Sequence, residues 1–269
     1  MLDIEQIRSS IEGNGFISFV YHFNELASTN TFASDHNVPV DSLIITDHQV
    51  SGKGRLNRTW KSAKDLNLTF SVKKKIILSP SENHFVICYF SYYVYLAIYD
   101  ELKKNLKKKE LQHLFIKWPN DIQFGNKKLC GILVESKLPS NEYVVGIGLN
   151  CNQERFGDEI NGTSIRNITG KEIDINKLLI NIINRFSQSF DLLLSARFDE
   201  IFRLWKNSTN IIGKTCSFDT GKEILNNGKI IDLNMDGSIS IQTGEKAADF
   251  YSGEIRITGL SLQKCPVIS

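Results

Sequence analysis

The chain has 269 residues, of which 41% are hydrophobic and 23% are charged, and its formal net charge is +2. These proportions are typical of a folded globular protein and exclude a disordered or fibrous chain. So small a net charge cannot hold the whole molecule on DNA or on an anionic membrane, so any cationic function must come from a local cluster.

The first quarter of the chain predicts two strands and a short helix. Residues 16–23 are aromatic and β-branched with polar residues between them, which favours a strand. The Ser-Thr-Asn sequence at 28–30 is typical of a helix N-cap, because Ser and Thr oxygens accept from free backbone N–H groups. Residues 42–46 predict a second strand, which leads into the glycine-containing, cationic loop 47–60.

A strand over 65–75 and one long apolar helix over 82–111 are expected next. The most apolar part of this helix, residues 85–99, is shorter than the roughly 20 residues that cross a bilayer, so we expect a buried core helix and no membrane partner. The helix ends in a run of lysines, which suits the dipole at a helix C-terminus. A solvated tail is one interpretation of this run, and a docking patch for an acidic partner is the other.

Residues 114–136 read as strand, turn, hairpin and strand, with Gly125 and Asn126 as a two-residue hairpin turn. A further strand is expected over 142–152, where Gly146 and Gly148 indicate either a close approach of backbone or ligand, or a bulge. Lys117 lies between Ile116 and Trp118, so its side chain should project to the opposite face. On the residues alone, Lys117 is either a surface lysine at a strand end or part of a site.

The last third of the chain changes character. Residues 175–206 have helical spacing of apolar residues with a break near Ser195 and Ala196. After Ser208, short strands alternate with turn sequences, which is typical of a small β-barrel. We place a domain boundary near 207–212, and so predict domains over 1–208 and 209–269.

The cysteines are far apart and odd in number, and none forms a C-x-x-C pair. This pattern argues against a disulfide framework or a zinc site and predicts buried, reduced thiols in a cytoplasmic protein. The N-terminal residues include acids and lack the apolar segment of a signal peptide. The five cysteines are Cys88, Cys130, Cys151, Cys216 and Cys265.

The loop 47–60 contains two glycines, one lysine and two arginines within seven residues. Such a loop offers backbone N–H groups and charge to an anion. It lacks the spacing of a P-loop or of a dinucleotide-binding motif, so by itself it predicts either an anion site or a solvated loop.

Five motifs together resemble the biotin–protein ligases: Ser-Thr-Asn at 28–30, the loop 47–60, KWPNDI at 117–122, KLCGILVE at 128–135 and GIGLN at 146–150. Their order and intervals match over nearly the whole chain. The resemblance implies an α+β fold, in which a mixed sheet with helices mainly on one face is followed by a small SH3-like barrel. It also implies that biotin is activated by ATP with Mg²⁺ as biotinyl-5′-AMP and then transferred to a lysine of a biotin carboxyl carrier protein.

The resemblance also implies roles for individual residues. Lys117 and Arg55 are the catalytic cations, since both steps concentrate negative charge. The biotin site comprises Ser28, Thr29, Asn30, Gln49, Lys53, Gly54, Arg55, Lys117 and Gly131. The ATP site comprises Arg55, Arg58, Trp60, Lys117, Asn120 and Asn150. Asn120 and Asn150 are also candidates to bind magnesium, and no metal ligand is assigned directly.

The loop departs from the family pattern G-R-G-R-R-G-R at Lys53, Leu56 and Asn57. Lysine keeps the charge but loses the bidentate fork of arginine. We hypothesise that the loop retains biotinyl-5′-AMP less firmly; equal rates of release from this protein and from a relative with the full arginine pattern would contradict this. The roughly 20 residues before the first motifs are too few for a helix-turn-helix domain, so we expect a ligase that does not bind a DNA operator, which a gel-shift assay would test.

Two other functions fit part of the pattern. A lipoate–protein ligase shares the fold and the adenylate strategy, although the KWPND turn favours biotin. A nucleic-acid-binding module would use the basic loop and the barrel, but the balanced charge and the lack of an aromatic stacking surface oppose it. The residues do not indicate an oligomeric state.

Overall fold

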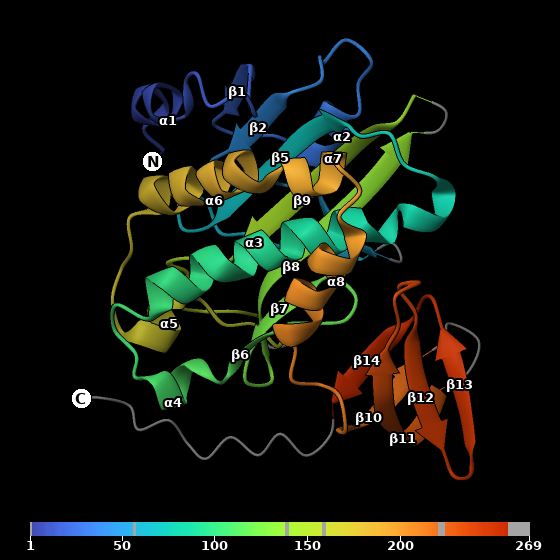
Figure 1. Ribbon diagram of the computed structural model, residues 1–269. Coiled ribbons are helices and arrows are strands. Elements are labelled where there is room, and N and C mark those ends of the chain that lie inside the picture. Colours follow the sequence, from blue (N-terminus) through green and yellow to red (C-terminus); the bar gives the residue numbers. More distant parts are fainter. Residues whose placement is uncertain (1, 56–57, 138–139, 158–159, 220–223, 258–269) are drawn as a thin grey trace.

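The computed structural model describes residues 2–55, 58–137, 140–157, 160–219 and 224–257. A seven-stranded sheet forms its centre (Figure 1), with strand order β1-β2-β5-β9-β8-β7-β6. Strands β1 and β2 are parallel, and the other neighbouring pairs are antiparallel, so the sheet is mixed as predicted. Its strands are β1 (Phe19–Phe23), β2 (Ser42–Thr46), β5 (Leu68–Lys75), β6 (Leu114–Lys117), β7 (Asp121–Phe124), β8 (Lys127–Lys137) and β9 (Glu142–Leu149).

Helices cover mainly one face of this sheet, where Figure 1 shows α3 and α6 crossing in front of the strands. Leu43 and Ile45 of β2 point into the large core beneath these helices. Ile44, between them, points to the other face and packs with Ala33 of the short helix α2. The helices are α1 (Ile4–Ile11), α2 (Thr29–Ala33), α3 (His84–Leu102), α4 (Lys108–Leu111), α5 (Ile165–Thr169), α6 (Ile175–Ser189), α7 (Asp191–Leu194) and α8 (Phe198–Asn207), with a 3₁₀ turn at Pro80–Glu82.

Most of the predicted element positions are confirmed. Strand β2 has the predicted bounds, and Ser28 caps α2 by accepting from the Thr31 N–H at 3.3 Å. Gly125, with φ of 63°, forms the hairpin turn between β7 and β8. The predicted break near Ser195 is the end of α7, after which Ala196 adopts a φ of 53°.

The prediction of one helix over 82–111 is wrong. Helix α3 ends at Leu102, its last buried residue, and α4 begins at Lys108. The lysines between them are exposed, so no apolar face holds the chain in a helix there, and Asn105 is a poor helix former. Lys103 and Lys104 pair with Asp100 and Glu101 at the end of α3, as a solvated tail does. Within the described ranges, no helix combines the length and the apolar character that crossing a membrane requires.

A second, five-stranded antiparallel sheet follows α8. Among the contacts that join it to the first part of the chain, the Trp118 indole donates to the Gly237 carbonyl at 3.0 Å, and the His84 ring lies 2.8 Å from the Met235 carbonyl. The predicted boundary falls between α8 and this sheet, and its barrel closure stays a prediction. The strands are β10 (Thr215–Asp219), β11 (Ile224–Leu233), β12 (Ile239–Thr243), β13 (Lys246–Phe250) and β14 (Glu254–Ile257).

Candidate active site

A cavity lies on the face of the large sheet that carries α2. It encloses about 960 Å³ of empty space, part of it continuous with solvent. Two rows of cross-strand neighbours run beneath it. One row is Ser71, Gly146 and Leu133, and the other is Thr69, Gly148 and Gly131.

The two β9 glycines make room for side chains that cross the sheet. A Cβ at Gly146 would lie 2.0 Å from the Asn30 amide oxygen, and a Cβ at Gly148 would lie 2.3 Å from the Trp60 ring. Both glycines keep regular register with β5 and β8, so the bulge interpretation is wrong. The close approach predicted from these glycines is therefore made by two side chains of the protein itself.

One end of the cavity is lined by neutral polar side chains. The Gln49 side-chain oxygen accepts from the Thr29 N–H at 2.9 Å and lies 3.2 Å from the Thr29 hydroxyl. The Ser71 hydroxyl lies 2.7 Å from the Thr29 hydroxyl and 2.6 Å from the Asn30 amide oxygen. These side chains are buried, and their mutual bonds hold them in one arrangement. Ser28, which also lines the cavity, fixes the start of the helix that carries Thr29 and Asn30.

The cationic loop closes the cavity as a short hairpin. Strands β3 (Gly52–Lys53) and β4 (Thr59–Trp60) are antiparallel, and the Gly54 N–H donates to the Arg58 carbonyl at 2.7 Å. The pairing holds Trp60 over the sheet, and its buried indole N–H has no hydrogen-bond partner among the described residues. Lys53 and Gly54 also line the cavity. Leu56 and Asn57, two of the departures from the family pattern, lie outside the described residues.

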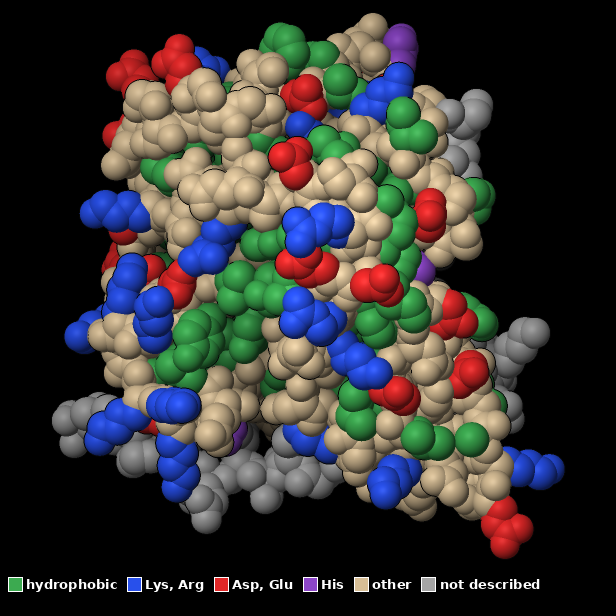
Figure 2. Space-filling view, in the orientation of Figure 1, with side chains coloured by type: hydrophobic (Ala, Val, Ile, Leu, Met, Phe, Trp, Pro, Cys, Tyr) green, Lys and Arg blue, Asp and Glu red, His purple; other side chains and the backbone are tan. Residues whose placement is uncertain are grey.

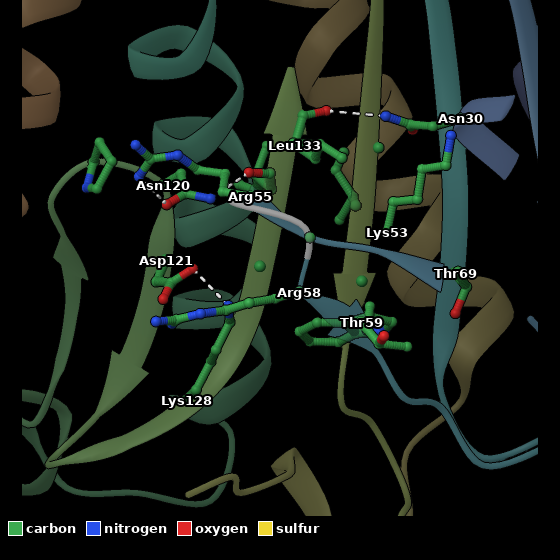
Figure 3. Close-up of a pocket in the computed structure, with 18 of the residues that line it drawn as sticks. Asn30, Lys53, Arg55, Arg58, Thr59, Thr69, Asn120, Asp121, Lys128 and Leu133 are labelled. Carbon is green, nitrogen blue, oxygen red and sulfur yellow. Dashed lines mark hydrogen bonds and ion pairs between the residues drawn. The ribbon is translucent and has the colours of Figure 1, made fainter. Parts of the chain in front are cut away.

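The opposite end is charged, as Figure 3 shows for Arg58, Asp121 and Lys128. Arg55 donates to the Asn120 amide oxygen at 3.3 Å, and Asn120 donates to the Ile132 carbonyl at 2.7 Å. Burial lowers the pKa of the Arg55 guanidinium, while the carboxylate of Asp121 acts in the opposite direction. Arg55 lines the cavity beside Asn120.

Lys117, at the end of β6, is only 9% exposed. Burial lowers the pKa of its ammonium, and the carboxylates of Asp121 and Glu254 partly oppose that effect. Its ammonium makes no hydrogen bond or ion pair within the part of the chain that the structure describes. A buried cation without a contact partner is costly, which is typical of a group that meets an anionic ligand.

Lys128 is a cavity residue that the sequence did not single out. It pairs with Asp121 at 2.8 Å, and its ammonium lies 5.4 Å from the centre of the Trp60 ring. Side chains along a regular strand point alternately to the two faces of the sheet. Counted back from Gly131, which faces the cavity, this alternation would turn Lys128 away from it. A register shift between β7 and β8 inserts one extra residue at Leu129 and reverses the alternation, so no sequence pattern indicated this lysine.

Glu254 is a second residue that the sequence did not identify. It begins β14 of the C-terminal sheet, lines the cavity and forms an ion pair with Arg58. The hydrogen bond from Arg58 is the main cause that lowers the pKa of Glu254, and the same contact raises the pKa of Arg58. The two sheets therefore share one site.

Twelve of the predicted site residues come together in this cavity, and Asn150 does not. The Asn150 side chain is buried and donates to the Thr163 carbonyl at 3.0 Å and to the Lys128 carbonyl at 3.4 Å. Its predicted role toward ATP and magnesium stays a prediction. Gly131 does lie in the cavity, where a Cβ would meet Lys128 at 2.9 Å and the Trp60 ring at 3.0 Å.

A second cavity of about 910 Å³ adjoins the first and shares Arg55, Asn120 and Leu133 with it. Its walls are largely apolar and include Ile87 and Val134. Two cavities that share a wall at Arg55 provide access to the same point from two sides.

Comparison with known proteins gives consistent results. Residues 23–152 match the Biotin/lipoate A/B protein ligase family. The chain is 27% identical over 251 residues to the bifunctional ligase/repressor BirA of Bacillus subtilis. This alignment covers 88% of this chain and 73% of that protein. It is 28% identical over 214 residues to biotin–protein ligase 2 of Arabidopsis thaliana, covering 74% and 62% respectively.

Solved structures agree with these matches. The biotin protein ligase from Aquifex aeolicus in complex with biotin and ATP has a TM-score of 0.72 and 26% identity, covering 90% of this chain and 99% of that one. The biotin protein ligase from Leishmania major in complex with biotinyl-5-AMP, at 18% identity, shares the fold with a TM-score of 0.60 and coverage of 87% and 98%. The fold that the motifs predicted is confirmed, and residues 23–152 are similar to the predicted class of ligase.

Proposed function

Because residues 23–152 form a domain of the Biotin/lipoate A/B protein ligase family, we propose that the protein is an ATP-dependent biotin–protein ligase. It activates biotin as biotinyl-5′-AMP and transfers the biotinyl group to a lysine of a biotin carboxyl carrier protein. The relatives named as biotin–protein ligases and the structure solved with biotin and ATP support this choice of substrates. The free, buried cysteines of the described residues fit the cytoplasmic location that we propose.

The two-ended cavity is the observation that carries the proposal. Its neutral end offers donors and acceptors from Thr29, Asn30 and Gln49, which suit the uncharged urea ring of biotin. Its other end brings together more cations than carboxylates, which suits a carboxylate beside a triphosphate. The cations are Arg55, Arg58, Lys117 and Lys128, and the carboxylates are Asp121 and Glu254.

In the first step, a biotin carboxylate oxygen attacks the α-phosphorus of ATP, and the bond to the β-phosphate oxygen breaks to release pyrophosphate. Lys117 and Arg55 reduce the repulsion between the two anions and stabilise the charge on the pentavalent phosphorus. We add Lys128 to these cations, since it faces the same space. Trp60 offers an unpaired N–H and a ring face on the nucleotide side.

In the second step, the neutral amine of the acceptor lysine attacks the acyl carbon, the bond to the phosphate oxygen breaks, and AMP leaves as the amine loses a proton. The second cavity leads to Arg55 and Asn120 between apolar walls. Such walls favour the neutral form of an entering lysine, which is the form that reacts. We therefore propose this cavity as the path of the acceptor lysine.

Magnesium enters with the triphosphate. Mg²⁺ binds through one or two carboxylates together with substrate phosphates and water, and Asp121, flanked by Asn120, fits that role. The described residues contain no group of three or more His, Cys, Asp or Glu side chains arranged to hold a metal.

The decisive experiment incubates the protein with biotin, ATP, Mg²⁺ and a carrier domain and measures the mass of the carrier. One added biotinyl group that requires ATP is the expected result. A carrier whose acceptor lysine is replaced by arginine is the control and should stay unmodified. An unchanged mass of the intact carrier under these conditions contradicts the proposal.

Lipoate ligation is the nearest alternative. The dithiolane ring of lipoate would leave the buried Thr29, Asn30 and Gln49 groups without partners, which is unfavourable. Pyrophosphate exchange measured with biotin and with lipoate distinguishes the two, and faster exchange with lipoate would decide for the alternative. Nucleic-acid binding has less support, because the cationic site residues line a cavity that also contains Asp121 and Glu254. On the face that carries α3 and α6, Figure 2 shows Lys and Arg interspersed with acidic side chains.

A further inference from the structure

Glu135 ends the Gly-Ile-Leu-Val-Glu motif on β8 and does not line either cavity described above. Its carboxylate is exposed, yet it accepts a 2.7 Å hydrogen bond from the amide nitrogen of Asn30. Asn30 is 4% exposed and lines the neutral end of the active cavity. One exposed carboxylate therefore reaches a buried site residue from outside.

The contact determines which way the Asn30 amide points. A carboxylate only accepts hydrogen bonds, so it selects the NH₂ group of Asn30 and repels the oxygen. The Leu133 carbonyl, 3.4 Å from the same nitrogen, favours the same orientation weakly. The amide oxygen is then held above Gly146 and faces the Ser71 hydroxyl at 2.6 Å.

The orientation of the Asn30 amide also decides which hydrogen bonds the Thr29 hydroxyl makes. With the Asn30 oxygen as its acceptor, the single Ser71 proton is committed to Asn30, so Thr29 must donate to Ser71 at 2.7 Å or to Gln49 at 3.2 Å. Both acceptor lone pairs of the Thr29 hydroxyl then remain available. If the Asn30 amide flipped, its NH₂ group would donate to Ser71, and Ser71 would in turn donate to Thr29 and take one of these two lone pairs.

We propose that Glu135 is a positioning residue that holds the Asn30 amide in one orientation and so leaves the Thr29 hydroxyl oxygen free to accept from a ligand N–H group. This inference rests on the proposed function, in which the N–H group belongs to the urea ring of biotin. It assigns a role in substrate selection to the last residue of the motif.

Kinetics test the proposal through variants of Glu135. In Glu135→Ala, the KM for biotin should rise about tenfold, the loss of roughly one hydrogen bond. The KM for ATP and kcat should stay unchanged. The KM of Glu135→Gln for biotin should lie between those of the wild type and Glu135→Ala. The glutamine amide oxygen still accepts a hydrogen bond from Asn30, but the orientation of the glutamine amide is not fixed. Glu245→Ala, the same substitution at an exposed glutamate for which the structure shows no side-chain hydrogen bond, is the matched control.

Two comparisons separate positioning from a general structural role. A biotin analogue methylated on the urea nitrogens should lose less affinity in Glu135→Ala than in the wild type. In an Asn30→Ala background, the substitution of Glu135 should not change the KM for biotin further, because the Asn30 amide that Glu135 orients is absent. A parallel fall in kcat and in thermal stability, or an undiminished effect in the Asn30→Ala background, would overturn the proposal.

A readout without activity distinguishes this proposal from the proposed function. The side-chain amide resonances of Asn30, assigned by their loss in Asn30→Asp, should shift in Glu135→Ala and exchange faster with solvent. Unchanged resonances would refute the role of Glu135 even in an active ligase. If the resonances shift as expected but the wild type binds no biotin, the proposed function fails and the positioning of Asn30 stands.

Discussion

At the scale of single residues, Lys117 and Lys73 make an informative pair, because the fold buries both ammonium groups but in different surroundings. Lys73 donates to the Val38 carbonyl at 2.7 Å and pairs with Glu142 at 3.3 Å. Lys117 has neither kind of contact within the described residues. The first arrangement stabilises the fold, and the second leaves a cation for a ligand.

Lys117→Met should therefore lower the rate of biotin-dependent pyrophosphate exchange by at least about 100-fold. Its midpoint of thermal unfolding should stay equal or rise, since a buried, uncompensated charge is removed. Lys73→Met is the control, and the opposite result is expected for it. Its midpoint of thermal unfolding should fall, while the folded protein should keep its rate of pyrophosphate exchange. Wild-type exchange in Lys117→Met would show that Lys117 is not a catalytic cation.

The glycines of β9 give a second test at this scale. Gly146→Ala places a methyl group 2.0 Å from the Asn30 amide oxygen, so Asn30 must leave its position above the strand. The KM for biotin should rise about tenfold or more, as overpacking of 1–3 kcal/mol implies. Gly157→Ala is the matched control, because a Cβ there meets no atom within 4 Å. Equal KM values for Gly146→Ala and Gly157→Ala would exclude the crossing of Asn30 over this strand.

At the scale of elements, strand β8 organises the site. Its extra residue turns Lys128 into the cavity, and its backbone at Lys128 is held by the side chain of Asn150. Asn150 also binds the Thr163 carbonyl, so it joins the end of β9 to the segment before α5. We infer that Asn150 supports the bulged part of β8 from behind.

Asn150→Ala should lower the free energy of unfolding by about 1–3 kcal/mol, because buried carbonyls lose their donors. The KM for ATP should stay close to that of the wild type. Asn120→Ala, at a residue that does line the cavity, should raise the KM for ATP with a smaller loss of stability. A rise in the KM for ATP in Asn150→Ala at unchanged stability would instead support the role in ATP binding that the sequence implied. Urea unfolding and steady-state kinetics measure both effects.

At the scale of the whole molecule, the two sheets meet at the cavity through Glu254 and Arg58. The pKa of Glu254 lies below its ordinary value of 4.5, chiefly because Arg58 donates to it. A carboxylate with a lowered pKa in the folded state stabilises that state above its unfolded pKa, and the contribution disappears as the pH falls through the folded pKa. The junction of the sheets should therefore weaken in acid.

Glu254→Gln tests this dependence. Near pH 7 it should lower the free energy of unfolding by only about 0.2–1 kcal/mol, because Arg58 is largely exposed and solvent screens the pair. The difference from the wild type should stay constant between about pH 6 and 8 and shrink below about pH 4.5. Glu245→Gln, on the exposed turn between β12 and β13, should show no such trend. A difference that grows in acid would contradict the pairing.

Much of the site follows from local sequence. The Ser-Thr-Asn cap, the loop glycines and the KWPND turn are short patterns whose conformations depend on neighbouring residues, and the structure brings them to one cavity. Helix α3 was expected to extend to 111 because its composition allows it, but it ends at Leu102, the last residue that it buries. Helix length here is a property of packing.

The sequence by itself determined the type and order of most elements, because these depend on local pattern and composition. The mixed sheet and twelve of the residues that line the cavity followed from the resemblance that its motifs carry. Only the tertiary structure decided that Lys128 faces the cavity, that Asn150 faces away from it, and that Glu254 reaches it from the second sheet. The physical reason is that a one-residue bulge reverses the alternation of a strand, and that contacts between distant segments depend on packing, which no local pattern encodes.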